Sequence, residues 1–295
     1  MDCALGCWQF GPSFGFWDGQ DAAQSRAVLR LGLKSGIRHF DTAPSYGNGL
    51  SEQLLGSVLK SRDRYGVFIA TKLMPGPSDP SASLRRSLDR LKTPYIDLVY
   101  LHYPGSRADR LRTLQAMAGL KERGLVRGIG LSNFSLRQIE EACSLFPIDW
   151  IQRPVSLLWT RELDAQLAFC REKGIKVAGY SPLGLGLLLG KSAQDSRRNL
   201  YCLRPESAEA FRALTETITE SSDPVSTCYS WVKAKNPDIV ILGARTEQQL
   251  MDDLLRMKSA PAGGPLFSRL DELADRLQAT APPEEENMFF HRGSL

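Results

Sequence analysis

The stretch HFDTAPSYGNG, at residues 39–49, places an acid and a phenol close together. Asp41 ends an apolar run of β-type, and Tyr46 lies in the Gly- and Pro-broken loop that follows. A free phenol has a pKa of about 10, so Tyr46 can act as an acid near neutral pH only beside a positive charge. The competing interpretation is a loop tyrosine that packs its ring, and for Tyr46 alone this is the better one.

Two further apolar runs end in residues that can complete such a site. Lys72 ends VFIATK and His102 ends IDLVYLH. We expect Lys72 to lower the pKa of the Tyr46 phenol, with Asp41 paired to Lys72. His102 would donate to the same substrate oxygen and stabilise its developing negative charge. Alone, each residue fits a solvated or structural role, but the four together favour chemistry at a carbonyl carbon.

No attacking group for that carbonyl is visible in the chain. The sequence holds no nucleophile elbow, no serine triad and no metal-ligand cluster, and it has only three histidines. A metal-dependent barrel hydrolase is therefore a weak alternative. The simplest hypothesis is therefore that a nicotinamide cofactor supplies a hydride to the carbonyl carbon.

The elements that position these residues are eight short apolar runs. They cover residues 3–8, 37–41, 67–72, 96–102, 126–132, 148–152, 175–180 and 238–243. Such runs suit strands of a parallel sheet that is buried on both faces. Leucine-rich stripes at helical spacing separate most of them, Ser135 is a candidate N-cap, and residues 266–277 predict a closing helix.

This alternation predicts an α/β fold, a TIM (β/α)8 barrel, as a single domain over residues 1–295. An open doubly wound sheet is the runner-up, although no GxGxxG follows the first run. In a barrel, the active site lies at the C-terminal ends of the strands. Six of the eight predicted ends are polar: Asp41, Lys72, His102, Ser132 with Asn133, Gln152, and Tyr180 with Ser181, while Gly243 ends the last run.

Composition and charge exclude several classes of function. The net charge of +4 is weakly basic and no run of five or six like charges appears, so neither nucleic-acid nor membrane-surface binding is supported. The six cysteines lack CxxC pairs, and no signal peptide or membrane-length apolar span is present. We therefore expect a cytoplasmic protein with reduced cysteines and without a metal, which binds a small-molecule substrate. The sequence leaves the oligomeric state open.

Motifs along nearly the whole chain resemble the aldo-keto reductase superfamily. GIRHFDTAPSYGNGLSEQLLG at 36–56, TKLMP at 71–75 and DLVYLHYP at 97–104 are similar to the segments that carry its catalytic Asp, Tyr, Lys and His. GLVRGIGLSNFS at 124–135, IQRPVSLLW at 151–159, GYSPLGLGLL at 179–188 and ILGARTEQQL at 241–250 resemble its cofactor-binding segments. The order along the chain is also that of the family.

The resemblance implies a role for each matching residue. Tyr46 would be the proton donor, Lys72 and Asp41 its tuning pair, and His102 the group that orients the carbonyl. Ser132, Asn133 and Gln152 would contact the carboxamide of the nicotinamide, and Tyr180 would stack on its ring. Ser181 and Leu183 would contact the pyrophosphate. The implied contacts at the adenosine end are Gly243, Arg245, Gln249, Asp252 and Asp253. Arginine suits a 2′-phosphate, so we expect NADPH/NADP+ as the cofactor.

Two departures from the family pattern concern the adenosine end. Asp253 stands where the family often has Asn, and Gly243 stands where other branches have a lysine. The adenine contact is therefore not the usual one. Arg245 is left as the main phosphate partner, so use of NADH is also possible.

Four aromatic residues in loops after strands are candidates for the substrate pocket: Trp17, Tyr103, Phe134 and Trp159. Core packing is the competing account for each, and we assign Trp8 and Trp150, inside predicted strands, to packing. Residues from about 265 to 295 would form a C-terminal helix and a tail able to cover the pocket.

Taken together, these features predict an NADPH-dependent oxidoreductase that reduces an aldehyde or ketone to an alcohol, with Tyr46 as the general acid. The alternative is a cofactor-sensing regulatory subunit with little turnover, similar to potassium-channel β subunits. The intact set of Asp41, Tyr46, Lys72 and His102 favours the enzyme. The identity of the carbonyl substrate is not encoded in these motifs.

Overall fold

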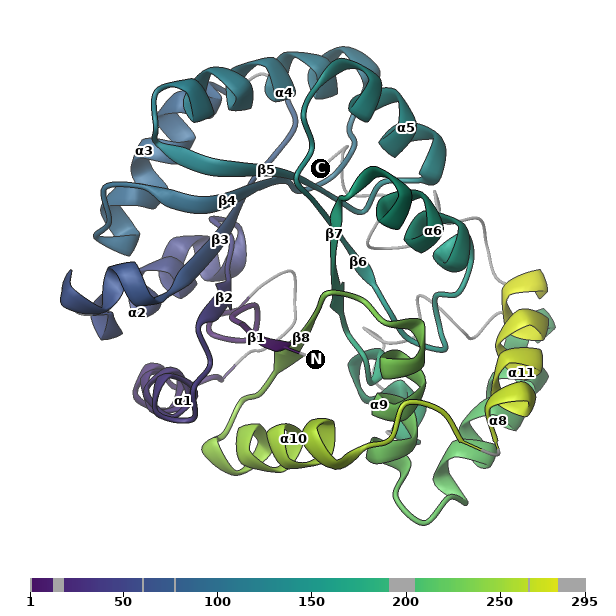
Figure 1. Ribbon diagram of the computed structural model, residues 1–295. Helices are drawn as coiled ribbons and strands as arrows, with labels where there is room; N and C mark the ends of the chain where they lie inside the picture. Colours follow the sequence, from purple (N-terminus) through teal and green to yellow (C-terminus); the bar gives the residue numbers. More distant parts are fainter. Residues whose placement is uncertain are drawn as a thin grey trace.

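Eight parallel strands close into a barrel in the order of the chain (Figure 1). A computed structural model describes residues 2–12, 19–59, 61–76, 78–190, 205–264 and 266–280. The strands are β1 (Asp2–Gly6), β2 (His39–Asp41), β3 (Phe68–Leu73), β4 (Ile96–Leu101), β5 (Val126–Ser132), β6 (Trp150–Pro154), β7 (Lys176–Tyr180) and β8 (Ile239–Gly243). The barrel predicted from the sequence is confirmed.

The first and last strands complete the barrel. In the parallel ladder between β1 and β8, Ala4 lies opposite Ile241, and on the other side of β1, Leu5 lies opposite Phe40 of β2. This closure rules out the open doubly wound sheet. Because all the strands run in the same direction, their C-terminal ends meet at one face of the barrel.

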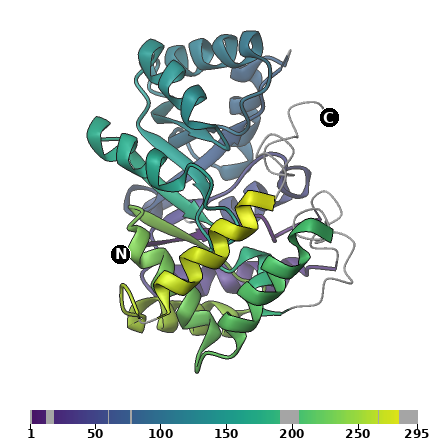
Figure 2. The same cartoon turned by 90° about the vertical axis from the view of Figure 1, so that its right-hand side faces the viewer.

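Helices surround the barrel (Figures 1 and 2). The α-helices are α1 (Ala22–Lys34), α2 (Leu50–Val58), α3 (Pro80–Leu91), α4 (Arg107–Glu122), α5 (Leu136–Leu145), α6 (Leu163–Lys173), α8 (Pro205–Thr219), α9 (Pro224–Lys235), α10 (Glu247–Ser259) and α11 (Phe267–Thr280). Short 3₁₀ segments are η1 (Tyr46–Gly49), η2 (Ser61–Gly66) and η3 (Gly184–Leu189). Helices α8 and α11 pack side by side on the outside of the barrel (Figure 2).

The local signals read from the sequence have clear structural counterparts. Ser135 caps α5 in a capping box with Gln138, as predicted from its position. Helices α8 and α9 were not predicted from the sequence, although buried Leu214 and Ile218 lie at helical spacing in α8. The sixth strand begins two residues later than expected, because its ladder with β5 starts where Trp150 faces Gly130.

The N-terminal end of the barrel interior is filled by aromatic rings. The imidazole of His39 lies 4.4 Å from the ring of Phe68 and 5.9 Å from that of Trp150, measured between ring centres. Trp150 therefore packs as expected. This layer lies at the opposite end of the strands from the polar residues that the sequence singled out.

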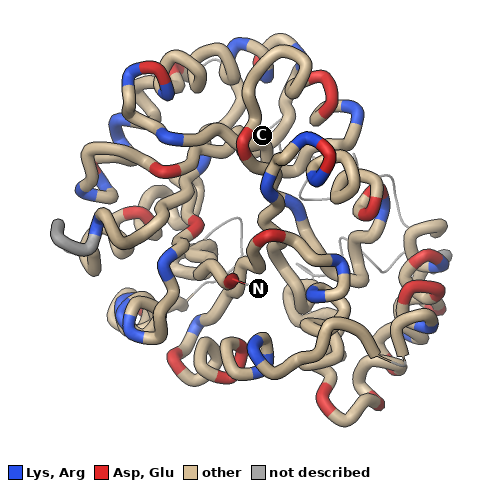
Figure 3. The backbone as a smooth tube through the Cα atoms, viewed as in Figure 1, with Lys and Arg blue, Asp and Glu red and all other residues tan. Residues whose placement is uncertain are grey.

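The outer surface carries both signs of charge. Lys and Arg residues are interspersed with Asp and Glu along the outer helices (Figure 3). Within the described ranges, every helix is too short or too polar to cross a bilayer. The five cysteines in these ranges are free thiols, and Cys202 lies outside them.

Candidate active site

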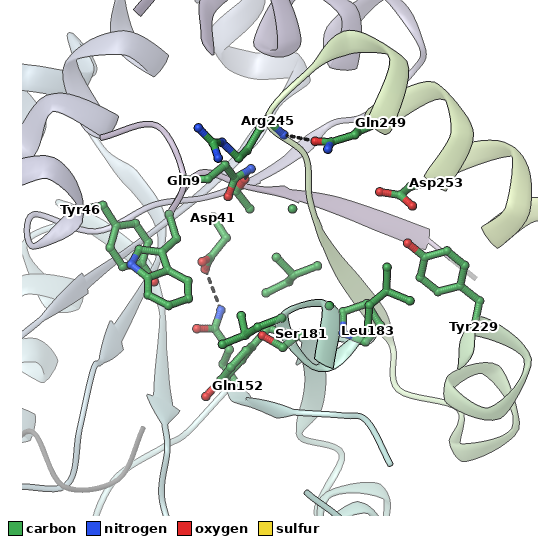
Figure 4. A pocket seen from close by; sticks show the side chains of 18 of the residues that line it. Gln9, Asp41, Tyr46, Gln152, Ser181, Leu183, Tyr229, Arg245, Gln249 and Asp253 are labelled. Carbon is green, nitrogen blue, oxygen red and sulfur yellow. Dashed lines mark hydrogen bonds between the residues drawn. The ribbon is translucent and has the colours of Figure 1, made fainter. Parts of the chain in front are cut away.

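A cavity of about 490 Å³ opens at the C-terminal ends of the strands (Figure 4). This volume lies within the range of about 300–1,000 Å³ that is typical of small-molecule sites. Of the residues that the sequence predicted for catalysis or cofactor binding, all but Lys72 line the cavity: Asp41, Tyr46, His102, Ser132, Asn133, Gln152, Tyr180, Ser181, Leu183, Gly243, Arg245, Gln249, Asp252 and Asp253. The barrel therefore brings together side chains from most of its strand ends.

Asp41 and Lys72 form a buried ion pair behind the cavity wall. The Nζ atom of Lys72 donates to Oδ1 of Asp41 at 2.6 Å and to the carbonyl oxygen of Thr42 at 3.0 Å. The Lys72 side chain is 1% exposed and does not line the cavity itself. Burial lowers the pKa of Lys72, whereas the Asp41 charge and hydrogen bond act in the opposite direction. The predicted pairing is confirmed.

Tyr46 sits beside this pair, held by an unusual loop. It begins η1, in which Gly47 and Asn48 both have positive φ, and it approaches Lys72 so that the ammonium lies 4.9 Å from the centre of the phenol ring. Burial raises the pKa of Tyr46 well above its usual value, and the charge of Asp41 raises it further. The net direction is thus opposite to the lowering that was expected from Lys72, because burial of the phenol opposes its ionisation.

His102 follows β4 directly and faces Tyr46. Its imidazole lies edge-on to the Tyr46 ring, with 5.9 Å between ring centres, and stacks on Tyr103 at 4.5 Å. Burial and the Lys72 charge lower the pKa of His102 well below its usual value. The ring is therefore neutral near pH 7, and one of its nitrogens carries a proton that can be donated to a bound oxygen.

The amide cluster next to Asp41 forms a continuous set of hydrogen bonds. The hydroxyl of Tyr180 donates to Oδ1 of Asn133 at 2.5 Å, and Nδ2 of Asn133 donates to Oγ of Ser132 at 3.1 Å. Ser132 in turn donates to Oε1 of Gln152 at 3.3 Å, and Nε2 of Gln152 donates to Oδ2 of Asp41 at 2.6 Å (Figure 4). Asn133 reaches this position with a φ of 66° and is held by its bond to the carbonyl oxygen of His102.

The other end of the cavity lies between the start of α10 and α9. Nε of Arg245 donates to Oε1 of Gln20 at 2.8 Å, and the backbone N–H of Arg245 donates to Oε1 of Gln249 at the same distance (Figure 4). Tyr229 of α9 faces Asp253 (Figure 4). Burial raises the pKa of the Tyr229 phenol, and the charge and hydrogen bond of Asp253 raise it further.

The two ends of the cavity suit the nicotinamide and adenosine ends of a nicotinamide dinucleotide. Ser132, Asn133 and Gln152 offer the neutral donors and acceptors that a carboxamide needs, and Arg245 offers a guanidinium suited to a phosphate. Between them, Gly243 exposes backbone to the cavity, where a Cβ would come within 3.5 Å of the Gln9 side chain. Gln9 itself is fixed by bonds to the carbonyl oxygens of Gly6 and Ala244. The residues present fit such a cofactor.

Comparison with known proteins assigns the chain to a family. Residues 3–261 match the model of the Aldo/keto reductase family. The chain belongs to this family. Aldo/keto reductases are oxidoreductases that generally use nicotinamide cofactors and act on small carbonyl compounds.

Three relatives illustrate the range of similarity. The chain is 32% identical to the aldo-keto reductase YhdN of Bacillus subtilis, over 65% of this chain and 61% of that protein. It is 28% identical to a probable voltage-gated potassium channel subunit beta of Oryza sativa, over 90% and 91% of the two chains. Among solved structures, glycerol dehydrogenase from Gluconobacter oxydans superposes with a TM-score of 0.75 at 26% identity, covering 94% and 91%.

The aldo/keto reductase barrel does not bring all of the predicted substrate-pocket residues to the cavity. Tyr103 lines it, but Phe134 and Trp159 are buried in the core and do not. The Phe134 ring packs within the core cluster, and its backbone carbonyl oxygen accepts from Gln166. Trp17 and the tail beyond residue 280 lie outside the described residues.

Several lining residues of this aldo/keto reductase were missed by the sequence reasoning. Trp8 lies past the end of β1 rather than within the strand. It packs against the core, as expected, but its ring also lines the cavity, 6.4 Å from that of Tyr46. Gln9, Tyr229 and Arg256 also line the cavity. The shortness of β1 is the signal that places Trp8 and Gln9 beyond a strand end. Within the described ranges, no group of three or more His, Cys, Asp or Glu side chains is arranged to hold a metal ion.

Proposed function

We propose that the protein is an NADPH-dependent oxidoreductase that reduces an aldehyde or ketone to an alcohol, with Tyr46 as the general acid. One observation carries the proposal. The cavity is lined by Tyr46, His102 and the Asp41 carboxylate. It is also lined by Ser132, Asn133 and Gln152 of the amide cluster. A proton donor and a site suited to a nicotinamide carboxamide thus share one wall of the barrel mouth.

The residues around Tyr46 have complementary tasks in this proposal. A raised pKa keeps the Tyr46 phenol protonated in the resting protein, so it is ready to donate. The Lys72 ammonium, 4.9 Å from the ring, stabilises the phenolate as the proton leaves, and Asp41 holds that ammonium in place. Neutral His102 donates a hydrogen bond to the carbonyl oxygen and fixes its direction.

The cofactor assignment follows the order of residues along the cavity. The bound dinucleotide would supply the hydride. Ser132, Asn133 and Gln152 would hold its carboxamide, and Tyr180 would stack on its ring. Ser181 and Leu183 would contact the pyrophosphate. At the adenosine end, Arg245 favours a 2′-phosphate and hence NADPH, with Gln249, Asp252 and Asp253 as the neighbouring contacts.

NADH remains a second candidate cofactor for a specific reason. Gly243 provides no lysine, and the adenosine end carries the carboxylates of Asp252 and Asp253, which oppose an additional negative charge. We also propose that the barrel and its C-terminal helix α11 form a single domain.

Nucleotide titration followed by turnover tests the proposal. The tryptophan fluorescence of the purified protein is titrated with NADPH and NADH, and the loss of NADPH absorbance is then followed with a panel of aldehydes, ketones and sugars. We expect tighter binding of NADPH than of NADH, together with turnover. Binding without turnover on any carbonyl would replace the reductase by a cofactor-sensing subunit. Failure to bind either nucleotide would overturn both.

A further inference from the structure

The Asp41 carboxylate is shared by two donors from opposite sides. Lys72 occupies its Oδ1 atom and the Gln152 amide occupies Oδ2, each at 2.6 Å. Asp41 and Gln152 are 4% and 3% exposed, so their hydrogen bond lies in a largely dehydrated environment. Charge-assisted bonds of this kind are roughly twice as strong as neutral ones. The bond joins the ion pair behind the proton donor to the amide cluster.

The hydrogen bond between Gln152 and Asp41 fixes the orientation of the Gln152 amide. A carboxylate can only accept, so the Nε2 end must face Asp41. The Oε1 end is then left to face Ser132, whose hydroxyl donates to it. With the amide turned over, two acceptor oxygens would face each other across the Asp41 contact. Removal of the carboxylate charge therefore removes the constraint on the amide.

The same polarity extends through the whole cluster. Each member donates in the direction of Asp41, from Tyr180 to Asn133, then to Ser132, then to Gln152. Hydrogen bonds arranged head to tail polarise one another and strengthen the chain. The pattern of donors and acceptors facing the cavity is thus set by the buried negative charge of Asp41, at the end of this series of hydrogen bonds.

We propose that Asp41 is a positioning residue for the cofactor's carboxamide site: through Gln152 it sets the amide orientation that the carboxamide meets, in addition to holding Lys72. This inference rests on the proposed function. Affinity for the nicotinamide half of the cofactor and competence of the proton donor then depend on the same carboxylate. Binding of the adenosine half does not.

An exchange of the two functional groups tests the proposal. In Asp41→Asn, the Lys72 ammonium attracts the new amide oxygen, so the new N–H group faces Gln152. The Gln152 amide then either keeps its orientation, donor against donor, or turns over and presents Nε2 to Ser132 in place of its oxygen. In Gln152→Glu, two carboxylates meet at the same place. In the double variant Asp41→Asn/Gln152→Glu, the new amide donates to the new carboxylate, Lys72 keeps an oxygen partner, Ser132 keeps an acceptor, and the net charge is that of the native chain.

We expect each single variant to weaken NADPH binding by about tenfold or more, as estimated for a lost hydrogen bond to a charged group. The double variant should recover most of this loss. Recovery shows that the two side chains act through each other. A double variant whose loss equals the product of the two single losses, or exceeds it, overturns the proposal.

Two controls separate this mechanism from general damage. Adenosine 2′,5′-bisphosphate, which lacks the nicotinamide, should bind all the variants as it binds the native chain, because Arg245 and Gln249 are untouched. Tyr46→Phe should lose turnover but keep its affinity for NADPH, since the phenol takes no part in the hydrogen-bond chain. If the single variants lost as much affinity for adenosine 2′,5′-bisphosphate as for NADPH, this would count against the proposal.

Urea unfolding of the four proteins extends the test to the protein without any nucleotide. Both single variants should lower the midpoint of unfolding, and the exchanged pair should lie above them. If the native chain binds no NADPH, the proposed function fails, whereas the link between Asp41 and Gln152 is still decided by these midpoints. An exchanged pair less stable than both single variants would remove the link itself.

Discussion

The ammonium of Lys72 lies 4.9 Å from the centre of the Tyr46 ring, and a buried bond to Asp41 holds it there. The cation faces the ring rather than the solvent. Two opposing effects therefore act on the phenol, namely burial, which retains its proton, and the adjacent positive charge, which stabilises the phenolate once the proton leaves. The first dominates in the resting protein.

Tyr46→Phe removes the donated proton and little else. We expect carbonyl reduction to fall by about 10²- to 10⁴-fold, the usual contribution of a general acid, while NADPH affinity and the fold are retained. Steady-state rates and fluorescence titration of the same preparation give the two quantities. A variant that retained most of the native turnover would rule out Tyr46 as the donor.

The rate of reduction at saturating NADPH should be nearly constant between about pH 6 and pH 9. Tyr46, with a raised pKa, keeps its proton through this range, and His102, with a lowered pKa, stays neutral. A profile of kcat against pH measures this directly. An alkaline decline centred near about pH 8, absent from a pH-stability control, would mean that Lys72 outweighs burial after all.

His39 should make the protein less stable in acid. Burial lowers its folded-state pKa to about 3, so below the unfolded value of about 6.5 the unfolded chain binds a proton that the folded chain does not. Stability therefore falls by about 1.4 kcal/mol per pH unit from this residue as the pH drops through that window. Between about pH 7.5 and pH 5, the native chain should lose about 2 kcal/mol more than His39→Gln in urea unfolding. Equal losses would contradict the assignment.

Glu52→Gln should destabilise the protein by about 1–3 kcal/mol. The Glu52 side chain is fully buried at the start of α2, where it accepts from the Thr71 hydroxyl at 2.7 Å and from Arg90 at 3.1 Å. An amide offers only one oxygen, so one donor loses its partner. Urea unfolding measures the difference, and Glu122→Gln, at an exposed position of α4, is the matched control. Similar effects in both variants would show that burial of Glu52 is unimportant.

Arg245→Leu should change the preference between the two nucleotides. Loss of the guanidinium removes charge-assisted bonds to a 2′-phosphate, so the Kd for NADPH should rise by about 10- to 100-fold, while the Kd for NADH changes much less. Parallel titrations with both nucleotides give the ratio. An equal rise for both would indicate that Arg245 supports the loop, through its bond with Gln20, rather than binding the phosphate.

The barrel and the clustering of the candidate catalytic residues were predictable because both follow from local patterns. Asp41, Lys72 and His102 each end or directly follow an apolar run, and parallel strands bring such ends to one face whatever the loops do. Loop aromatics were less predictable. Phe134 turns into the core and Trp8 lines the cavity, because their directions depend on tertiary contacts that no local spacing encodes.

The interactions between distant elements were beyond the sequence. The bond from Gln152 to Asp41 joins residues 111 positions apart, and its geometry depends on the packing of the whole barrel. The raised pKa of Tyr46 has the same origin, since the extent of burial is a property of the assembled site. Residue types identify the participants, whereas their protonation states require the fold.

The pairing of β1 with β8 has a consequence for synthesis of the chain on the ribosome. β1 is made first, yet its partner, β8, spans Ile239–Gly243 and emerges only after most of the chain has been made. Until then, one edge of β1 lacks its native ladder, and an unpaired strand edge is a template for association with other chains. Gly243 and Arg245 appear at the same late moment. A nascent chain can therefore neither close its sheet nor bring the two ends of its cavity together until β8 has left the ribosome.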